Sequence, residues 1–325
     1  MVFAGLTVGV YLKRGWTRHM EKKNAPAAAP VNVERQSTGL TFSKGEGTQK
    51  VFTVEASKSI DFKGLNASDL EGVKITIFGK DGARHDTMET HTCRYTKDSG
   101  DIVCSGDVEI VLMSAEQWKA ASGKPGAPGT MKIETKGMAF NRASGEARTD
   151  AEVKFAFAEG TGDAIGAEYN SEAGTLRLQK NVKLKLDPPA TAKEKTSAAN
   201  TRKEPVVITG SRMDFARDAR TMLLSGPAEA STPSQRLTAA ALLLELDTSF
   251  HAQRLIAKSG GKEQRPEFTA AKGAGKEKLS ADEIIATFAP QGWVTHAEAN
   301  GDVSGESERG EETQSVNARN ATTKS

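Results

Sequence analysis

The chain has 325 residues, enough for one large domain or two of ordinary size. Its 44 Lys and Arg nearly balance its 42 Asp and Glu, so no general positive field is available to grip nucleic acid or an anionic membrane. Hydrophobic residues make up 37% and aromatic residues 6%, a composition that excludes a wholly disordered chain and a multi-span membrane protein and predicts a core with few large side chains.

The N-terminus resembles part of a membrane anchor. Residues 1–12 carry no charged side chain, and residues 13–23 are mostly basic. A helix of this length spans about 18 Å, short of a bilayer core of about 30 Å. Three interpretations stay open: the last half of a transmembrane helix, a poor signal sequence, or a short interfacial or buried helix. Basic residues after the apolar run count against an anchor, because the positive-inside rule would place the body in the cytoplasm.

Proline placement divides the rest of the chain. Residues 31–124 and 129–187 contain no proline, so both windows are free to form sheet, which excludes proline from its central strands. The sequence predicts five segments: an apolar anchor remnant and Pro/Ala tether over 1–36, a β unit over 37–187, a polar linker over 188–205, a second β unit over 206–303 and a partly disordered tail over 304–325.

A recurring hairpin unit predicts the fold. An aromatic residue is followed five positions later by glycine and eight positions after that by valine, in units that begin at Tyr95, Phe140 and Tyr169. A fourth unit begins at Phe215 and lacks the glycine. The alternation of apolar and polar residues after each glycine, as also over 51–56 and 73–78, is typical of antiparallel strands with one buried face. Irregular spacing favours stacked hairpins over a strict solenoid.

Helical spacing is rare. It occurs over 114–121, and residues 236–246 fit either a strand or an amphipathic helix. A similar stretch begins 42 residues later, with Leu279-Ser280-Ala281 in place of Leu237-Thr238-Ala239. We favour strands for both.

The two cysteines test the hairpin geometry. A two-residue turn at Asp98 and Ser99 makes Lys97 face Gly100, and the same register makes Cys93 face Cys104. Facing residues in antiparallel strands have Cβ atoms about 4.5–5.5 Å apart, near disulfide reach. We therefore expect a disulfide and an oxidising compartment. Two buried thiols are the alternative, and a longer turn that includes Gly100 would break the register.

Metal and catalytic sites have little support. Alternation places Glu89, His91 and Cys93 on one strand face, a set that could ligate zinc. No second ligand cluster accompanies them, so a solvated or half-buried strand is the favoured interpretation. The sequence has neither a nucleophile-elbow motif nor a phosphate-binding glycine loop. We expect no bound metal, no cofactor and no enzymatic activity.

Three stretches carry a family resemblance. They are LTFSKGEGTQKVFTVEA over 40–56, the pattern Y-x4-G-x-I-x-C-x-G-x-V from Tyr95, and LSADEIIATFAPQGWVTHAEANGDV over 279–303. They resemble the periplasmic lipopolysaccharide-export proteins of the LptC/LptA/OstA-like group, with residues 38–112 similar to the LptC part and residues 206–303 similar to the OstA-like part. The resemblance implies an all-β fold, an open β-jellyroll of antiparallel hairpins in two tandem units with a short N-terminal membrane-anchor-like helix. The short anchor, its flanking charge and the cysteine pair depart from the pattern.

The resemblance also implies a function. The protein would be a periplasmic lipopolysaccharide transport component, tethered to the inner membrane by its N-terminus. Its partners would be lipopolysaccharide, an inner-membrane ABC transporter complex and β-jellyroll bridge proteins joined by edge-strand pairing, with no nucleic acid. A structural envelope or adhesin-like β protein that binds only protein partners is the alternative.

An apolar groove would hold the acyl chains, since each buried methylene contributes about 0.8 kcal/mol. Plain core packing is the alternative role of its residues. The outward Arg177, Lys183 and Lys185 could meet lipid phosphates or simply face solvent. The predicted groove residues are Phe52, Val54, Ile75, Ile77, Ile102, Val108, Ile110, Val153, Phe155, Leu176, Leu178, Val182 and Leu184.

Overall fold

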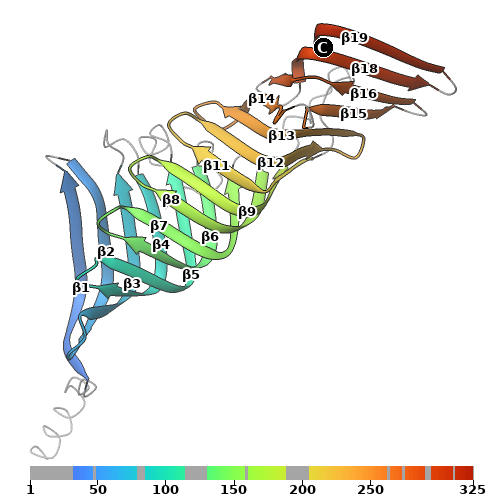
Figure 1. Ribbon diagram of the computed structural model, residues 1–325. Coiled ribbons are helices and arrows are strands. Elements are labelled where there is room, and N and C mark those ends of the chain that lie inside the picture. Colours follow the sequence, from blue (N-terminus) through green and yellow to red (C-terminus); the bar gives the residue numbers. More distant parts are fainter. Residues whose placement is uncertain are drawn as a thin grey trace, which may run out of the picture.

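The computed structural model shows one elongated, twisted roll of antiparallel strands that runs from β1 at one end to β19 at the other (Figure 1). The predicted N-terminal helix and the helical spacing at 114–121 lie outside the described residues. Those described are 32–46, 49–78, 85–113, 130–157, 160–187, 205–261, 264–272, 275–289, 294–309 and 312–324.

Within the described residues, nineteen strands form a single sheet. The first part contains β1 (Val33–Glu46), β2 (Gln49–Phe62), β3 (Ala67–Phe78), β4 (His85–Thr96), β5 (Asp101–Met113), β6 (Thr130–Asn141), β7 (Glu146–Phe157), β8 (Gly160–Asn170) and β9 (Thr175–Leu186). The second part contains β10 (Val206–Gly210), β11 (Arg212–Ala216), β12 (Thr221–Ser231), β13 (Gln235–Leu246), β14 (Ala252–Lys258), β15 (Glu267–Lys272), β16 (Gly275–Ser280), β17 (Glu283–Phe288), β18 (Val294–Arg309) and β19 (Glu312–Lys324).

The all-β class with successive antiparallel hairpins is confirmed, and the fold is consistent with a β-jellyroll. Residues 51–56 and 73–78 lie in β2 and β3, and residues 236–246 form β13 rather than a helix. The tail differs from the expectation. Residues 304–325 contain the last six residues of β18 and all of β19. The two strands pair from His296↔Lys324 to Arg309↔Glu312, with one register shift between Asn300 and Val303. Backbone pairing, not burial, holds β19, because its described side chains are exposed.

The hairpin turns stack on one another. The carbonyl oxygen of Gly100 accepts a hydrogen bond from the backbone N–H of Arg142 at 3.1 Å. Gly145 accepts in the same way from Ser171, and Gly174 from Arg217, each at 3.2 Å. In each case the donor is the second residue after the leading aromatic of the next unit. The recurring pattern in the sequence is thus a ladder of turns along one edge of the roll.

Each long strand bends near its middle. In β5, Ile102 and Cys104 are buried before the bend and Val108 and Ile110 after it, while the three residues 105–107 between them are exposed. The register with β6 shifts at the same place, and Gly106 has a φ of 93°. Bulges of this kind bend a strand and let both halves turn the same face inward. In the second part the bend becomes a break, as between β10 and β11. We call this line of bends the corner.

The corner folds the sheet onto itself. Phe52 of β2 and Phe140 of β6 are four strands apart, a distance of about 19 Å in a flat sheet. Their rings nevertheless meet edge to face with centroids 5.3 Å apart. We call the strand halves that end at the turns 63–66, 97–100, 142–145, 171–174 and 217–220 the turn wall. The halves that end at 47–48, 79–84, 114–129, 158–159 and 187–205 form the loop wall, and the line opposite the corner, where the free ends of both walls meet, is the mouth.

The sheet continues without interruption from the first part into the second. Strand β9 pairs with β10 on the loop wall, with Leu184 facing Ile208, and with β11 on the turn wall, with Leu178 facing Met213. All four side chains are buried. The division into two units with a linker over 188–205 stays a prediction, but the two parts share one sheet and one core.

Candidate functional site

The interior between the walls is the candidate site. All thirteen predicted groove residues lie on the inner face of the sheet and belong to one continuous apolar cluster. The most exposed of them, Ile110, is only 7% accessible. The walls are therefore in contact in this structure, and contact of these residues with lipid stays a prediction.

The interior extends further than the sequence reasoning proposed. It continues into the second part of the chain through four side chains that are each at most 1% exposed, Ile208, Met213, Met222 and Leu224. The alternation of residues 221–224 and 237–246 was the signal that could have identified this extension. Towards β19 the inner face becomes more open, because Phe268, Leu279 and Phe288 are only partly buried.

Cys93 of β4 and Cys104 of β5 face each other and form a disulfide with an S–S distance of 2.16 Å. The predicted register holds from Thr92↔Ser105 to Tyr95↔Ile102. The expected two-residue turn at Asp98 and Ser99 is wrong: the turn spans 97–100, and the N–H of Gly100 donates to the carbonyl oxygen of Thr96 at 2.9 Å without breaking the register. Both sulfurs belong to the inner cluster. The disulfide thus ties two neighbouring strands on the turn wall.

The prediction that Glu89, His91 and Cys93 share one strand face is wrong. A register shift between Thr90 and Thr92 interrupts the alternation of β4. Glu89 and His91 are exposed, whereas Cys93 points inward to its disulfide partner. Within the residues that the structure describes, no group of three or more His, Cys, Asp or Glu side chains is placed to hold a metal ion.

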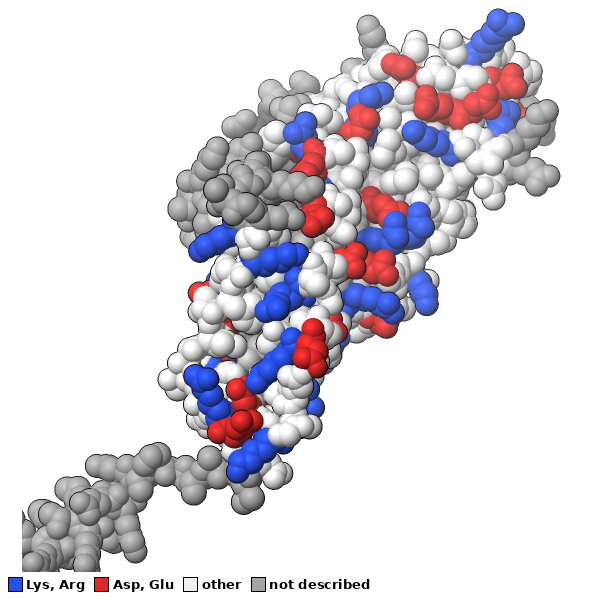
Figure 2. Space-filling model, turned by 60° about the vertical axis from the view of Figure 1, so that its left-hand side comes forward, with Lys and Arg blue, Asp and Glu red and all other residues white. Residues whose placement is uncertain are grey.

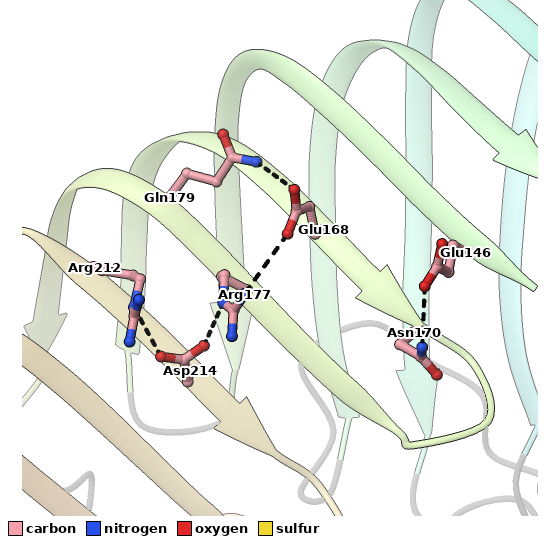
Figure 3. A network of polar contacts seen from close by, with 7 residues as sticks. All are labelled: Glu146, Glu168, Asn170, Arg177, Gln179, Arg212 and Asp214. Atoms are coloured by element: carbon pink, nitrogen blue, oxygen red, sulfur yellow. Dashed lines mark hydrogen bonds and ion pairs between the residues drawn. The ribbon is translucent and has the colours of Figure 1, made fainter.

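The outer face is polar along its length. On the face shown in Figure 2, Lys and Arg alternate with Asp and Glu. The close-up in Figure 3 shows one such network, in which Arg177 of β9 lies 2.7 Å from Asp214 and 3.9 Å from Glu168, and Arg212 lies 2.9 Å from Asp214. The hydrogen bond to Asp214 raises the pKa of Arg177. Arg177, which could have met a lipid phosphate, is therefore already paired with carboxylates.

The other two residues that could meet phosphates, Lys183 and Lys185, lie on the same outer face. Lys183 and Lys185 line a hollow of about 600 Å³, together with Lys132, Lys154 and the carboxylates of Glu134, Glu152 and Asp163. Lys185 also lies 3.5 Å from Asp187. The charges of both signs around this hollow favour a solvated surface over a dedicated anion site.

The mouth is closed by polar contacts between the two walls. Near β1, Lys44 Nζ donates to the carbonyl oxygen of Ala143 at 2.6 Å. The guanidinium of Arg142 lies over the rings of Phe42 and Tyr95, at 5.5 Å and 5.8 Å from their centroids. Residues of β1 on the loop wall thus contact turns of the turn wall that belong to later hairpins.

A buried cluster closes the mouth further along. The carboxylate of Asp86 in β4 accepts hydrogen bonds from Arg217, from Tyr169 Oη at 2.6 Å and from the backbone N–H of Met113 at 3.2 Å. Asp86 is fully buried, and Arg217 and Tyr169 are each 6% exposed. Sequence reasoning did not identify this cluster. The one available signal was a charged residue at an inward position of β4, two residues before the buried Met88.

These features define a class: an all-β roll of the jellyroll type, with a continuous apolar interior and polar outer faces. The comparisons with known proteins agree. Residues 27–187 match the family model described as lipopolysaccharide-assembly, LptC-related. The chain belongs to the LptC-related family of lipopolysaccharide-assembly proteins, which makes it a component of lipopolysaccharide transport. No curated protein matches the chain.

The family is one of transport proteins, and the absence of enzymatic activity stays a prediction. It is associated with the periplasm and the inner membrane. In the part of the chain that the structure describes, no helix is long and apolar enough to cross a membrane. The predicted anchor over residues 1–36 lies almost wholly outside that part.

Proposed function

We propose that the protein carries the acyl chains of lipopolysaccharide between the turn wall and the loop wall and passes them along the roll. The observation that supports this most strongly is the continuity of the apolar interior across the junction of β9 with β10 and β11. An uninterrupted inner face offers a path on which a chain need not leave an apolar surface.

The energetics of exchange favour this path. Each methylene that moves from water to an apolar surface gains about 0.8 kcal/mol, so a chain of about ten methylenes gains about 8 kcal/mol. Contacts between the walls, such as that of Phe52 with Phe140, are of the same apolar kind. Acyl chains that insert between the walls therefore replace one set of apolar contacts with another, and no catalytic group is required.

The two ends of the sheet could pair with partner proteins. Among the described strands, β1 pairs only with β2 and β19 pairs only with β18. Each therefore presents a free edge of unpaired backbone groups, which favours the addition of a strand from another protein. We propose that the β1 end faces the inner-membrane ABC transporter complex and that the β19 end faces the next β-jellyroll protein, with the N-terminal residues as the tether to the inner membrane.

Site-specific photo-crosslinking tests the lipid-binding part of this proposal. Leu184 and Lys183 are neighbours in β9 and point to opposite faces, the first fully buried and the second exposed. A photo-reactive residue at Leu184 should form an adduct with lipopolysaccharide, and the same residue at Lys183 should not. Equal adducts at both positions, or none at Leu184, would contradict it and would favour a protein that binds only protein partners.

A further inference from the structure

Asp86 is the one charged residue in a buried row of the loop wall. Across neighbouring strands Phe52 faces Ile77, and Ile77 faces Asp86. The row continues on β5, β6 and β7, where Leu112 faces Met131 and Met131 faces Phe157. The five apolar members are each at most 5% exposed. A buried carboxylate in an apolar row is costly unless it is paired, so its partners define its role.

Two of these partners come from the opposite wall. Tyr169 is on β8 and Arg217 begins the turn after β11, both on the turn wall, whereas the Met113 N–H comes from the loop wall. Strands β4 and β8 are four apart, about 19 Å in a flat sheet. The cluster therefore exists only while the two walls are closed on each other.

We propose that Asp86, Tyr169 and Arg217 form a latch that holds the mouth shut, and that opening this latch is the step that admits acyl chains to the interior. This inference rests on the proposed function. Arg217 lies outside residues 27–187, the segment that matches the LptC family. The second part of the chain thus supplies the cation that closes the first part.

The chemistry of the cluster suits a reversible closure. An apolar pair at this place would bind the walls at least as well, since replacing a buried ion pair with apolar residues is often neutral or stabilising. An ion pair differs in the open state. When the walls separate, the carboxylate and the guanidinium both become hydrated, so the exposed latch gains back much of its desolvation cost. An apolar pair that becomes exposed gains no such hydration energy.

Isosteric variants test the latch. Asp86→Asn and Arg217→Met each remove one charge, and the double variant removes both without leaving a buried unpaired charge, so it should fold. Asp214→Asn is the matched control, because it breaks an Arg–Asp pair on the outer face of the same hairpin, where Arg177 and Asp214 are 50% and 28% exposed (Figure 3). Far-ultraviolet circular dichroism and melting curves confirm that each variant is folded.

Two measurements separate the latch from the proposed function. Amide hydrogen exchange without lipid should be faster at the turn 217–220 and at the start of β4 in the double variant, and unchanged in the control. Unchanged exchange in the folded double variant overturns the latch. The second measurement is the rate at which a photo-reactive residue at Leu184 acquires purified lipopolysaccharide.

The rate should rise roughly tenfold in the double variant, because an amide and a thioether cannot re-form the charge-assisted hydrogen bond between Arg217 and Asp86, and should stay at the wild-type value in Asp214→Asn. A rate equal to wild type, with an adduct present, overturns gating by the latch while the proposed function stands. The absence of any adduct in all variants contradicts the proposed function, and hydrogen exchange then still decides whether the cluster closes the mouth.

Discussion

Replacing Cys93 and Cys104 with alanine should lower the stability of the protein by an amount set by the loop that their disulfide closes. The two cysteines are 11 residues apart. In the chain-entropy description, a disulfide that closes a loop of this length removes about 9 cal/mol/K from the unfolded state, or about 2.8 kcal/mol at 25 °C. The unfolding entropy of a chain of this length is about 0.7 kcal/mol/K, so the melting temperature should fall by about 4 °C.

Differential scanning calorimetry with and without reductant measures this effect. The wild-type protein melted in the presence of a phosphine reductant should match the double alanine variant, and the variant itself should not respond to reductant. Labelling of thiols in the oxidised, denatured wild-type protein should detect none. Two free thiols per chain, or a variant that melts within about 1 °C of wild type, would refute the reasoning from the hairpin loop.

Three further predictions concern packing, backbone and pH. Phe140→Ala should lower the free energy of unfolding by about 3–5 kcal/mol, because the ring is buried against Phe52 of the opposite wall. Urea unfolding measures this loss of stability, and a loss smaller than that of the exposed control Val103→Ala would contradict the contact between the walls. Gly106→Ala should cost about 1–2 kcal/mol, because the residue has a φ of 93° with nothing near its Cβ position, whereas Gly305→Ala should be neutral. The hydrogen bond from Ser68 lowers the pKa of Asp61 from its usual 3.8, and Lys97 lowers it further. A lowered pKa adds stability that is lost as the pH falls through the pKa of the folded state, so the stability difference between wild type and Ser68→Ala should be full at pH 7 and shrink below about pH 4. An equal difference at both pH values, measured by urea unfolding, would contradict this prediction.

The local features of the fold could be predicted from the sequence because their causes are local. Period-two alternation identified the strands at 51–56 and 73–78, and the glycine turns fixed a register in which Cys93 faces Cys104. The bulge between Thr90 and Thr92 has no comparable signature in the sequence, and because of it the prediction that Glu89, His91 and Cys93 share a strand face is wrong.

Features that depend on contacts between distant segments could not be predicted from the sequence. Strand β19 is polar and resembles a disordered tail in composition, but it is held by pairing with β18. The closure of the mouth joins Asp86 to Arg217, which are 131 residues apart. Neither residue belongs to a periodic pattern that relates them, because their contact results from the folding of the sheet at the corner.

The central claim is that one interior carries lipid through both parts of the chain. Photo-reactive residues at Leu178 in β9 and at Leu244 in β13, each on the inner face and at most 1% exposed, test it in a single time course with lipopolysaccharide supplied by the inner-membrane transporter. The claim predicts adducts at both positions, with Leu178 labelled before Leu244 and no adduct at the outward Lys183. Labelling confined to Leu178, or adducts at Lys183 as strong as those inside, would contradict a continuous path.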